Sequence, residues 1–105
     1  MHILNRFYTF INSYCIEEFL ASNEFLTPFL LEGYRQIKKV FENSIVDISI
    51  EYISNEGFEG IFITITTSVP PKESLDLLDV LDNTWWLDVN YETRKIVEIG
   101  IRSKG

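Results

Sequence analysis

The sequence predicts an α+β fold in which helices pack on a mostly antiparallel four-stranded sheet. Apolar residues recur at three- and four-residue spacing in three segments, as they do on one face of a helix. In four shorter segments they alternate with polar residues or form short runs rich in β-branched and aromatic side chains, which is typical of strands. Proline, glycine and asparagine separate the segments. The expected order is therefore helix, helix, hairpin, helix, hairpin.

Two helices are expected before the first hairpin. Residues 3–20 contain no proline or glycine, and their apolar side chains form one broad helical face. A clearer helix covers about residues 28–42. The Thr27 hydroxyl can cap the free amide groups at its start, and Pro28 has no N–H to leave unsatisfied there.

The first hairpin follows a change from helical spacing to strict alternation. Apolar side chains alternate with polar ones over residues 46–52, and a second alternating segment covers about 58–69. The turn between them, 54–57, has the sequence Ser-Asn-Glu-Gly, which is typical of a hairpin connection. Pro70 and Pro71 end the second strand because proline cannot donate to a sheet ladder.

A third helix and a second hairpin complete the expected fold. The helix covers about residues 71–82, followed by strands at 84–89 and 95–102 around a turn at 90–94. The residues expected on the buried side of this helix are Leu75, Leu77, Leu78, Val80 and Leu81.

The order of these elements suggests a repeat. Residues 28–69 and 71–102 each read as a helix followed by a hairpin, so an αββ duplication is conceivable, although the two segments share little sequence. We expect residues 1–105 to form one α+β domain.

Composition and charge exclude several classes of function. The chain has 105 residues, with 16 acidic and 9 basic side chains and a net charge of −7. This charge argues against binding nucleic acid through its phosphates and against attachment to anionic membranes. The longest uncharged stretch, 60–71, is shorter than the roughly 20 apolar residues that a membrane span needs. The one cysteine, Cys15, fits a reducing compartment. We expect a cytoplasmic protein.

The inventory of reactive side chains gives no prediction of an active site. His2 is the only histidine and Cys15 the only cysteine, too few for a zinc site. No glycine-rich phosphate-binding motif occurs. Asp82 and Asp88, on either side of the expected helix–strand turn, could act as a general acid and base. Because 16 acidic residues allow many such pairs, this pair does not predict an enzyme. We expect no catalytic residue, metal or cofactor.

The two adjacent tryptophans predict an aromatic sheet face. Neighbouring residues of a strand point to opposite sides, so Trp85 is expected under the helices and Trp86 on the outer face. That outer face would show Phe58, Phe62, Trp86 and Ile96. Large exposed apolar patches mark interaction sites. We therefore expect helix 3–20, a second copy of the chain or another protein to cover it.

A block of acidic residues is the second candidate surface. From Glu73 to Glu92 the chain has six carboxylates and no lysine or arginine. On a helix, Asp76, Asp79 and Asp82 form a slanted ridge, and Asp88 follows it. This ridge is either a solvated helix face or a docking surface for a basic partner.

Most of the chain, about residues 26–101, resembles a family of small uncharacterised bacterial proteins. The resemblance lies in LTPFLLEGYRQIKKVF, the hairpin after it, and SVPPKESLDLLDVLDNTWWLDV. It is sharpest at 78–88, although the family often has an acidic residue before the tryptophans where this chain has Asn83-Thr84. The resemblance implies an α+β fold of helix, hairpin, helix and hairpin, and no settled activity.

These observations favour a non-enzymatic protein-interaction module. It would bind a partner protein or a second copy through the aromatic sheet face, with the acidic block as a rim. One version is an acidic antagonist that masks a basic partner, as antitoxins and nuclease inhibitors do.

Two alternatives remain open. The first is a small-molecule pocket between the sheet and helix 3–20, lined by Arg6, Tyr14, Tyr34, Arg35 and Tyr52. The second is binding of single-stranded nucleic acid by stacking on Phe62 and Trp86. The chain shows no continuous positive groove of the kind that usually accompanies such stacking.

Overall fold

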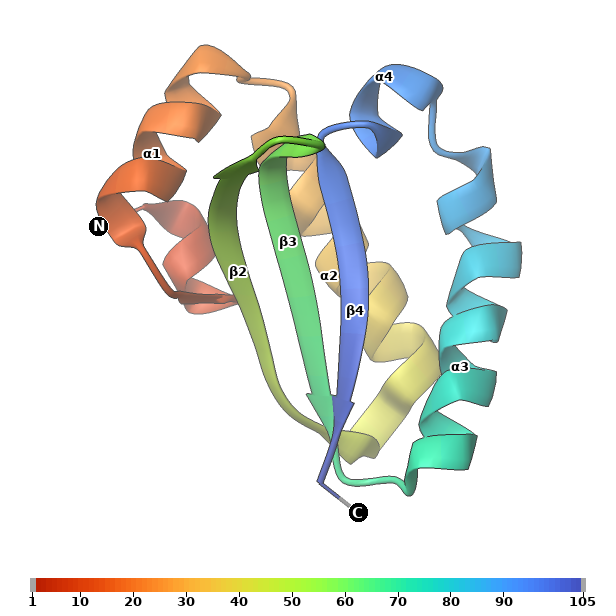
Figure 1. The fold of residues 1–105 in the computed structure, drawn as a ribbon. Coiled ribbons are helices and arrows are strands. Elements are labelled where there is room, and N and C mark those ends of the chain that lie inside the picture. Colours follow the sequence, from red (N-terminus) through yellow and green to blue (C-terminus); the bar gives the residue numbers. More distant parts are fainter. Residues whose placement is uncertain (1, 105) are drawn as a thin grey trace.

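The computed structural model describes residues 2–104 and has an α+β fold (Figure 1). Four helices and three short 3-10 helices (η) accompany a four-stranded sheet of order β1-β2-β3-β4. In chain order the elements are η1 (Ile3–Arg6), β1 (Thr9–Phe10), α1 (Ser13–Ser22), α2 (Leu26–Phe41), η2 (Glu42–Ser44), β2 (Ile45–Asn55), β3 (Phe58–Thr67), α3 (Pro71–Thr84), η3 (Trp86–Asp88), α4 (Tyr91–Arg94) and β4 (Val97–Ser103).

The sheet is mixed, so the prediction of a mostly antiparallel sheet is wrong. Only β2 and β3 pair antiparallel, as the predicted first hairpin. The pairs β1–β2 and β3–β4 are parallel. The physical reason is that each parallel pair is joined by a helical crossover. The crossover returns the chain to the end of the sheet at which the first strand began, so the next strand runs in the same direction. β4 thus arrives through α3 rather than through a second hairpin.

The predicted strand at 84–89 does not form. α3 continues to Thr84, and the Trp85 amide still donates to the Leu81 carbonyl in a helical bond of 3.0 Å. One 3-10 turn, η3, follows, and the Asn90 side chain then caps α4 by accepting from the Thr93 amide. The bulky side chains that suggested a strand instead end a helix.

The strand pairing repeats as strand–helix–strand rather than as the suggested αββ unit. Residues 9–55 run from β1 through two helices to β2, and residues 58–103 run from β3 through α3 to β4. The β2–β3 hairpin joins these two halves in the middle of the sheet (Figure 1).

The predicted helix 3–20 is divided into η1, β1 and α1. β1 lies parallel to β2, and the Ile11 amide donates to the Ile50 carbonyl. The Asn12 side chain then continues the ladder. Its Nδ2 donates to the Tyr52 carbonyl over 3.0 Å, and its Oδ1 accepts from the Tyr52 amide over 2.9 Å. One side-chain amide therefore stands in for a strand residue at this edge.

The core lies between the helices and one face of the sheet. The register places Ile50, Ile63 and Ile99 side by side across β2, β3 and β4, with further isoleucines before and after them. α2 covers this face from behind in Figure 1 and buries an apolar stripe against it. The stripe consists of Leu26, Leu30, Ile37 and Phe41.

The other face of the sheet is open in Figure 1. Among residues 2–104, no helix is long and apolar enough to cross a membrane.

Candidate interaction surfaces

Phe62 lies on the open face of the sheet, as predicted. Its ring covers Gly100 of the neighbouring strand, where an added Cβ would come within 2.8 Å of the ring. The register surrounds it with polar and charged side chains, so the face is not the continuous aromatic surface that the sequence predicted. Glu51 and Glu98 pair with Phe62, and Ser49 and Thr64 lie one step further along the strands. Ile53, opposite Gly60, is an apolar residue on the same face.

Phe58 and Ile96 lie toward one end of this face and are half-buried. Phe58 begins β3 at the hairpin. Ile96 precedes β4, and its carbonyl accepts from the Ile61 amide over 2.9 Å. The same carbonyl passes so close to Gly60 that an added Cβ would lie 2.0 Å from it, which explains the glycine.

Trp86 is not on the open face, because residues 86–88 form a 3-10 turn instead of a strand. Both tryptophans lie on the helical side, against Phe29 of α2. The Trp85 ring stacks on the Phe29 ring with their centroids 5.3 Å apart. The centroid of the Trp86 ring lies 6.3 Å from that of Phe29 and 5.7 Å from that of Trp85. Gly33 makes room for Trp85, since a Cβ there would lie 3.1 Å from Trp85 Cη2. The aromatic cluster therefore fixes the end of α3 to α2.

α3 exposes two residues that were predicted to be buried. Leu75 is 55% exposed and Val80 is 46% exposed, whereas Leu81 is fully buried. The apolar residues of this helix are spread too widely around it. Leu75 and Val80 are five residues apart, which places them about 140° from each other around the axis. One side of α3 faces α2 and β4. That side is too narrow to bury both Leu75 and Val80.

Two members of the predicted acidic ridge, Asp76 and Asp79, lie between these two exposed aliphatic side chains. Asp76 and Asp79 are exposed, and Asp82 is half-buried at the side of the helix. Asp88 is exposed in η3, next to Leu87, which is also exposed. In the described chain, none of these four aspartates forms an ion pair. The only acid of the block that does is Glu92, which lies 3.0 Å from Lys95.

The carboxyl of Asp82 has a pKa above its ordinary value, because burial disfavours the charge and Asp79 adds repulsion. Asp88 does not contribute to this shift, so the acid–base pair that was considered from the sequence has no electrostatic support. The raised pKa of Asp82 therefore reflects mainly the partial burial of its carboxyl, with a smaller contribution from Asp79.

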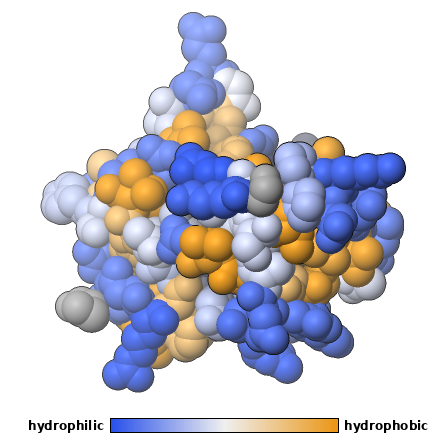
Figure 2. All heavy atoms as spheres, turned by 90° about the horizontal axis from the view of Figure 1, so that it is seen from below, coloured by the Kyte–Doolittle hydropathy of each residue, from blue (hydrophilic) through white to orange (hydrophobic). Residues whose placement is uncertain are grey.

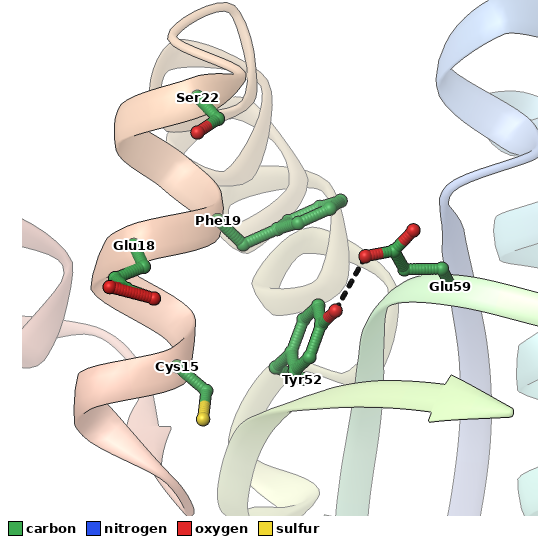
Figure 3. A pocket seen from close by; sticks show the side chains of 6 residues that line it. All are labelled: Cys15, Glu18, Phe19, Ser22, Tyr52 and Glu59. Atoms are coloured by element: carbon green, nitrogen blue, oxygen red, sulfur yellow. Dashed lines mark hydrogen bonds between the residues drawn. The ribbon is translucent and has the colours of Figure 1, made fainter.

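A shallow hollow of about 220 Å³ lies between α1 and the β2–β3 hairpin (Figure 3). The Tyr52 hydroxyl donates to Glu59 Oε2 over 2.6 Å, a bond that raises the pKa of Tyr52, and the Phe19 ring lies 5.3 Å from the Tyr52 ring. The hollow is smaller than the roughly 300–1,000 Å³ of ordinary ligand pockets. Its lining is Cys15, Glu18, Phe19, Ser22, Tyr52 and Glu59.

Of the five residues predicted to line a pocket here, only Tyr52 does so. Tyr34 and Arg35 line a separate depression along α2, together with Gln36, Lys38 and Lys39. The predicted pocket between the sheet and helix 3–20 is therefore not assembled from those five side chains.

The remaining reactive side chains have local contacts. The His2 Nδ1 accepts from the Leu4 amide at the start of η1, and Cys15 is an exposed free thiol on α1. Within residues 2–104, no three His, Cys, Asp or Glu side chains are grouped so that they could hold a metal ion.

Seen from below, the molecule shows hydrophobic patches separated by hydrophilic side chains (Figure 2). The exposed residues of α3 are mixed as well: Leu75 and Val80 lie beside Asp76 and Asp79. One signal for this surface is present in the sequence: the third helix has more apolar residues than one side can bury.

Comparison with known proteins gives no relative: no family model matches the chain, no curated protein is similar to it in sequence, and no solved structure matches it.

Proposed function

We propose that this chain is a non-enzymatic protein-interaction module that binds a partner through the α3 outer face. We define the α3 outer face as Leu75, Asp76, Asp79, Val80 and Asn83, all of which are exposed. The observation that carries the proposal is the pair of half-exposed aliphatic side chains on either side of carboxylates that have no cationic partner. Interfaces combine apolar contacts with complementary charge in this way.

The charge of the surface favours a different protein over a second copy at this site. A symmetric dimer brings the same patch of both copies together. Asp76 and Asp79 would then face the aspartates of the second copy, and like charges across an interface are unfavourable. A partner with lysines or arginines between apolar side chains fits both parts of the surface.

Proteins with such basic surfaces commonly bind acidic polymers, above all nucleic acids. A module that docks on a basic surface through α3 competes with the polymer for it. The proposal therefore includes an antagonist role, in which binding blocks the basic surface through which the partner binds its polymer. Electrostatic attraction would also speed the encounter of the two proteins.

The experiment compares two charge-reversal variants in capture from an extract of the producing cells. The test variant carries Asp76→Lys with Asp79→Lys on α3. The control carries Glu17→Lys with Glu24→Lys, at exposed positions on and beside α1. Each substitution adds 2 to the net charge, so both variants change it from −7 to −3.

We expect the wild type and the α1 control to retain the same basic protein, and the α3 variant to lose it. Mass spectrometry identifies the protein, and titration of the purified pair measures the affinity. Equal loss in both variants would show attraction by net charge alone. Retention by the α3 variant, or no bound protein in the wild type, would contradict the proposal.

A further inference from the structure

β4 leaves one edge of the sheet without a neighbouring strand in the described residues. It is last in the sheet order and pairs only with β3. The Ile61 amide donates to Ile96 and the Lys104 amide to Thr67, so even-numbered residues of this segment bond to β3. Because backbone groups alternate in direction along a strand, those of Ile99 and Ile101 point to the outer edge.

The sequence of β4 is complementary to itself about its midpoint, Gly100. If two copies pair antiparallel with their glycines opposite each other, Glu98 lies opposite Arg102 of the second copy, and Arg102 opposite its Glu98. Ile99 then lies opposite Ile101 of the second copy. Glu98 and Arg102 are exposed, and neither forms an ion pair within residues 2–104.

The direction of the backbone groups agrees with this register. Ile99 and the facing Ile101 both point outward, so they form a hydrogen-bonded pair. Glu98 and the facing Arg102 form a non-hydrogen-bonded pair, in which the Cα atoms are only about 4.5 Å apart and the side chains are close. A shift by two residues in one direction sets Glu98 against Gly100. In the other direction it sets Arg102 against Gly100 and Glu98 against Lys104, so only the centred register pairs Glu98 with Arg102.

Phe62 adds an apolar contact at the same place. Its ring lies over Gly100 on the open face of the sheet. In the joined sheet, the two glycines face each other across strands about 4.8 Å apart. The two Phe62 rings, each over its own glycine, then meet across the symmetry axis and cover it.

We propose that two copies of this chain join along β4 into one eight-stranded sheet, in the register centred on Gly100. The contact uses residues outside the α3 outer face. The dimer can therefore be disproved without disproving the binding of a basic partner, and the reverse also holds. The two α3 helices lie on the same side of the joined sheet, and each chain carries a charge of −7. The association is therefore measured near 0.15 M salt, where the screening length is about 8 Å.

The experiment is light scattering during size-exclusion chromatography over a series of protein concentrations. We expect the wild type to approach twice the chain mass of 12.3 kDa as concentration rises. Glu98→Arg and Arg102→Glu each place like charges opposite each other twice per dimer. Each should raise the dimer dissociation constant by about tenfold or more, given the usual strength of cross-strand pairs.

The double variant, Glu98→Arg with Arg102→Glu, reverses both charges and restores the pairing, so we expect it to dimerise like the wild type. Glu51→Arg, which reverses a charge on the same face but in β2, should leave the dimer unchanged. Circular dichroism verifies that each variant is folded. A wild type that stays at 12.3 kDa, a double variant that is not rescued, or equal dissociation by Glu51→Arg would overturn the proposal.

Discussion

The helices α2 and α3 hold corresponding places in the two halves of the fold, yet they differ in how much of their surface is buried. Each leads into the second strand of a parallel pair. α2 buries Leu26, Leu30, Gly33, Ile37 and Phe41, a single stripe at three- and four-residue spacing. α3 buries only Ser74 and Leu81.

The difference shows that the distribution of apolar residues around a helix decides how much of its apolar surface the core buries. The core buries the whole of a single stripe. A wider distribution leaves some side chains outside, and on α3 these lie beside aspartates without cationic partners. On α2, in contrast, Glu32 contacts Arg35 at 2.7 Å and Gln36 at 2.6 Å. We therefore regard α2 as structural and propose α3 for recognition.

The largest effect is expected from Leu30→Ala. Leu30 is fully buried in the centre of the α2 stripe, and removing its side chain leaves a cavity between helix and sheet. The free energy of unfolding should fall by about 2–5 kcal/mol. Urea denaturation followed by circular dichroism measures it. A loss below about 1 kcal/mol would show that α2 is not the structural helix of the pair.

A smaller loss is expected from Tyr8→Phe, which removes a contact that holds the segment between η1 and β1 to α2. The buried Tyr8 hydroxyl donates to the Leu30 carbonyl over 2.7 Å. Loss of this bond should reduce stability by about 0.5–1.5 kcal/mol.

The Tyr8→Phe variant also tests a pH dependence. Burial raises the pKa of Tyr8 above its ordinary value of 10.0, with a smaller contribution from Tyr34. The folded protein therefore keeps a proton that the unfolded chain releases, and stability is fully present below pH 10 and falls above it. Thermal unfolding between pH 8 and 11 should show a steeper decline in the wild type than in the variant. Equal slopes would contradict this.

Leu75→Ala should barely change stability, because Leu75 is 55% exposed on the α3 outer face. We expect a change within about 0.5 kcal/mol in the urea experiment used for Leu30→Ala. A loss comparable to that of Leu30→Ala would mean that α3 contributes as much to the core as α2 does. The same variant should weaken binding of the proposed basic partner.

The smallest effect, and the only stabilising one, is expected from Asp82→Asn. Burial and Asp79 raise the pKa of Asp82, so its protonated form favours folding, and this contribution is lost as the pH rises through the raised value. At pH 7 the charged side chain is unfavourable, and the variant should melt slightly higher than the wild type. Below pH 3.8, the ordinary value, the advantage should disappear. An equal difference at pH 3 and pH 7 would show that charge is not the cause.

Much of the fold could be predicted where local pattern and packing agree. The predicted helix at 28–42 is α2 at Leu26–Phe41, and the hairpin strands lie within two to three residues of their predicted ends. The prediction for the segment at Trp85 and Trp86 was wrong because aromatic residues favour strands, whereas contact with Phe29 decides its structure. β1 has only two residues and depends on Asn12, which sequence spacing does not reveal.

The candidate surfaces could likewise be predicted only where local spacing decides which side chains are exposed. Exposure of Asp76 and Asp79 follows from helical spacing, which the sequence contains. The aromatic sheet face depended on Trp86 being in a strand and failed with it. Exposure of Leu75 and Val80 depends on how closely α3 approaches its neighbours, a tertiary property that apolar spacing alone does not determine.

The Asn12 amide has a consequence for how far chains could assemble. By occupying both backbone groups of Tyr52, it closes the β2 edge at the point where the short β1 has already ended. Growth of a sheet into a fibril requires two receptive edges, because each added molecule must offer a new one. Within residues 2–104 the β1 edge offers a strand of only two residues, whereas β4 offers seven, so we expect edge-to-edge association to stop at the pair instead of propagating.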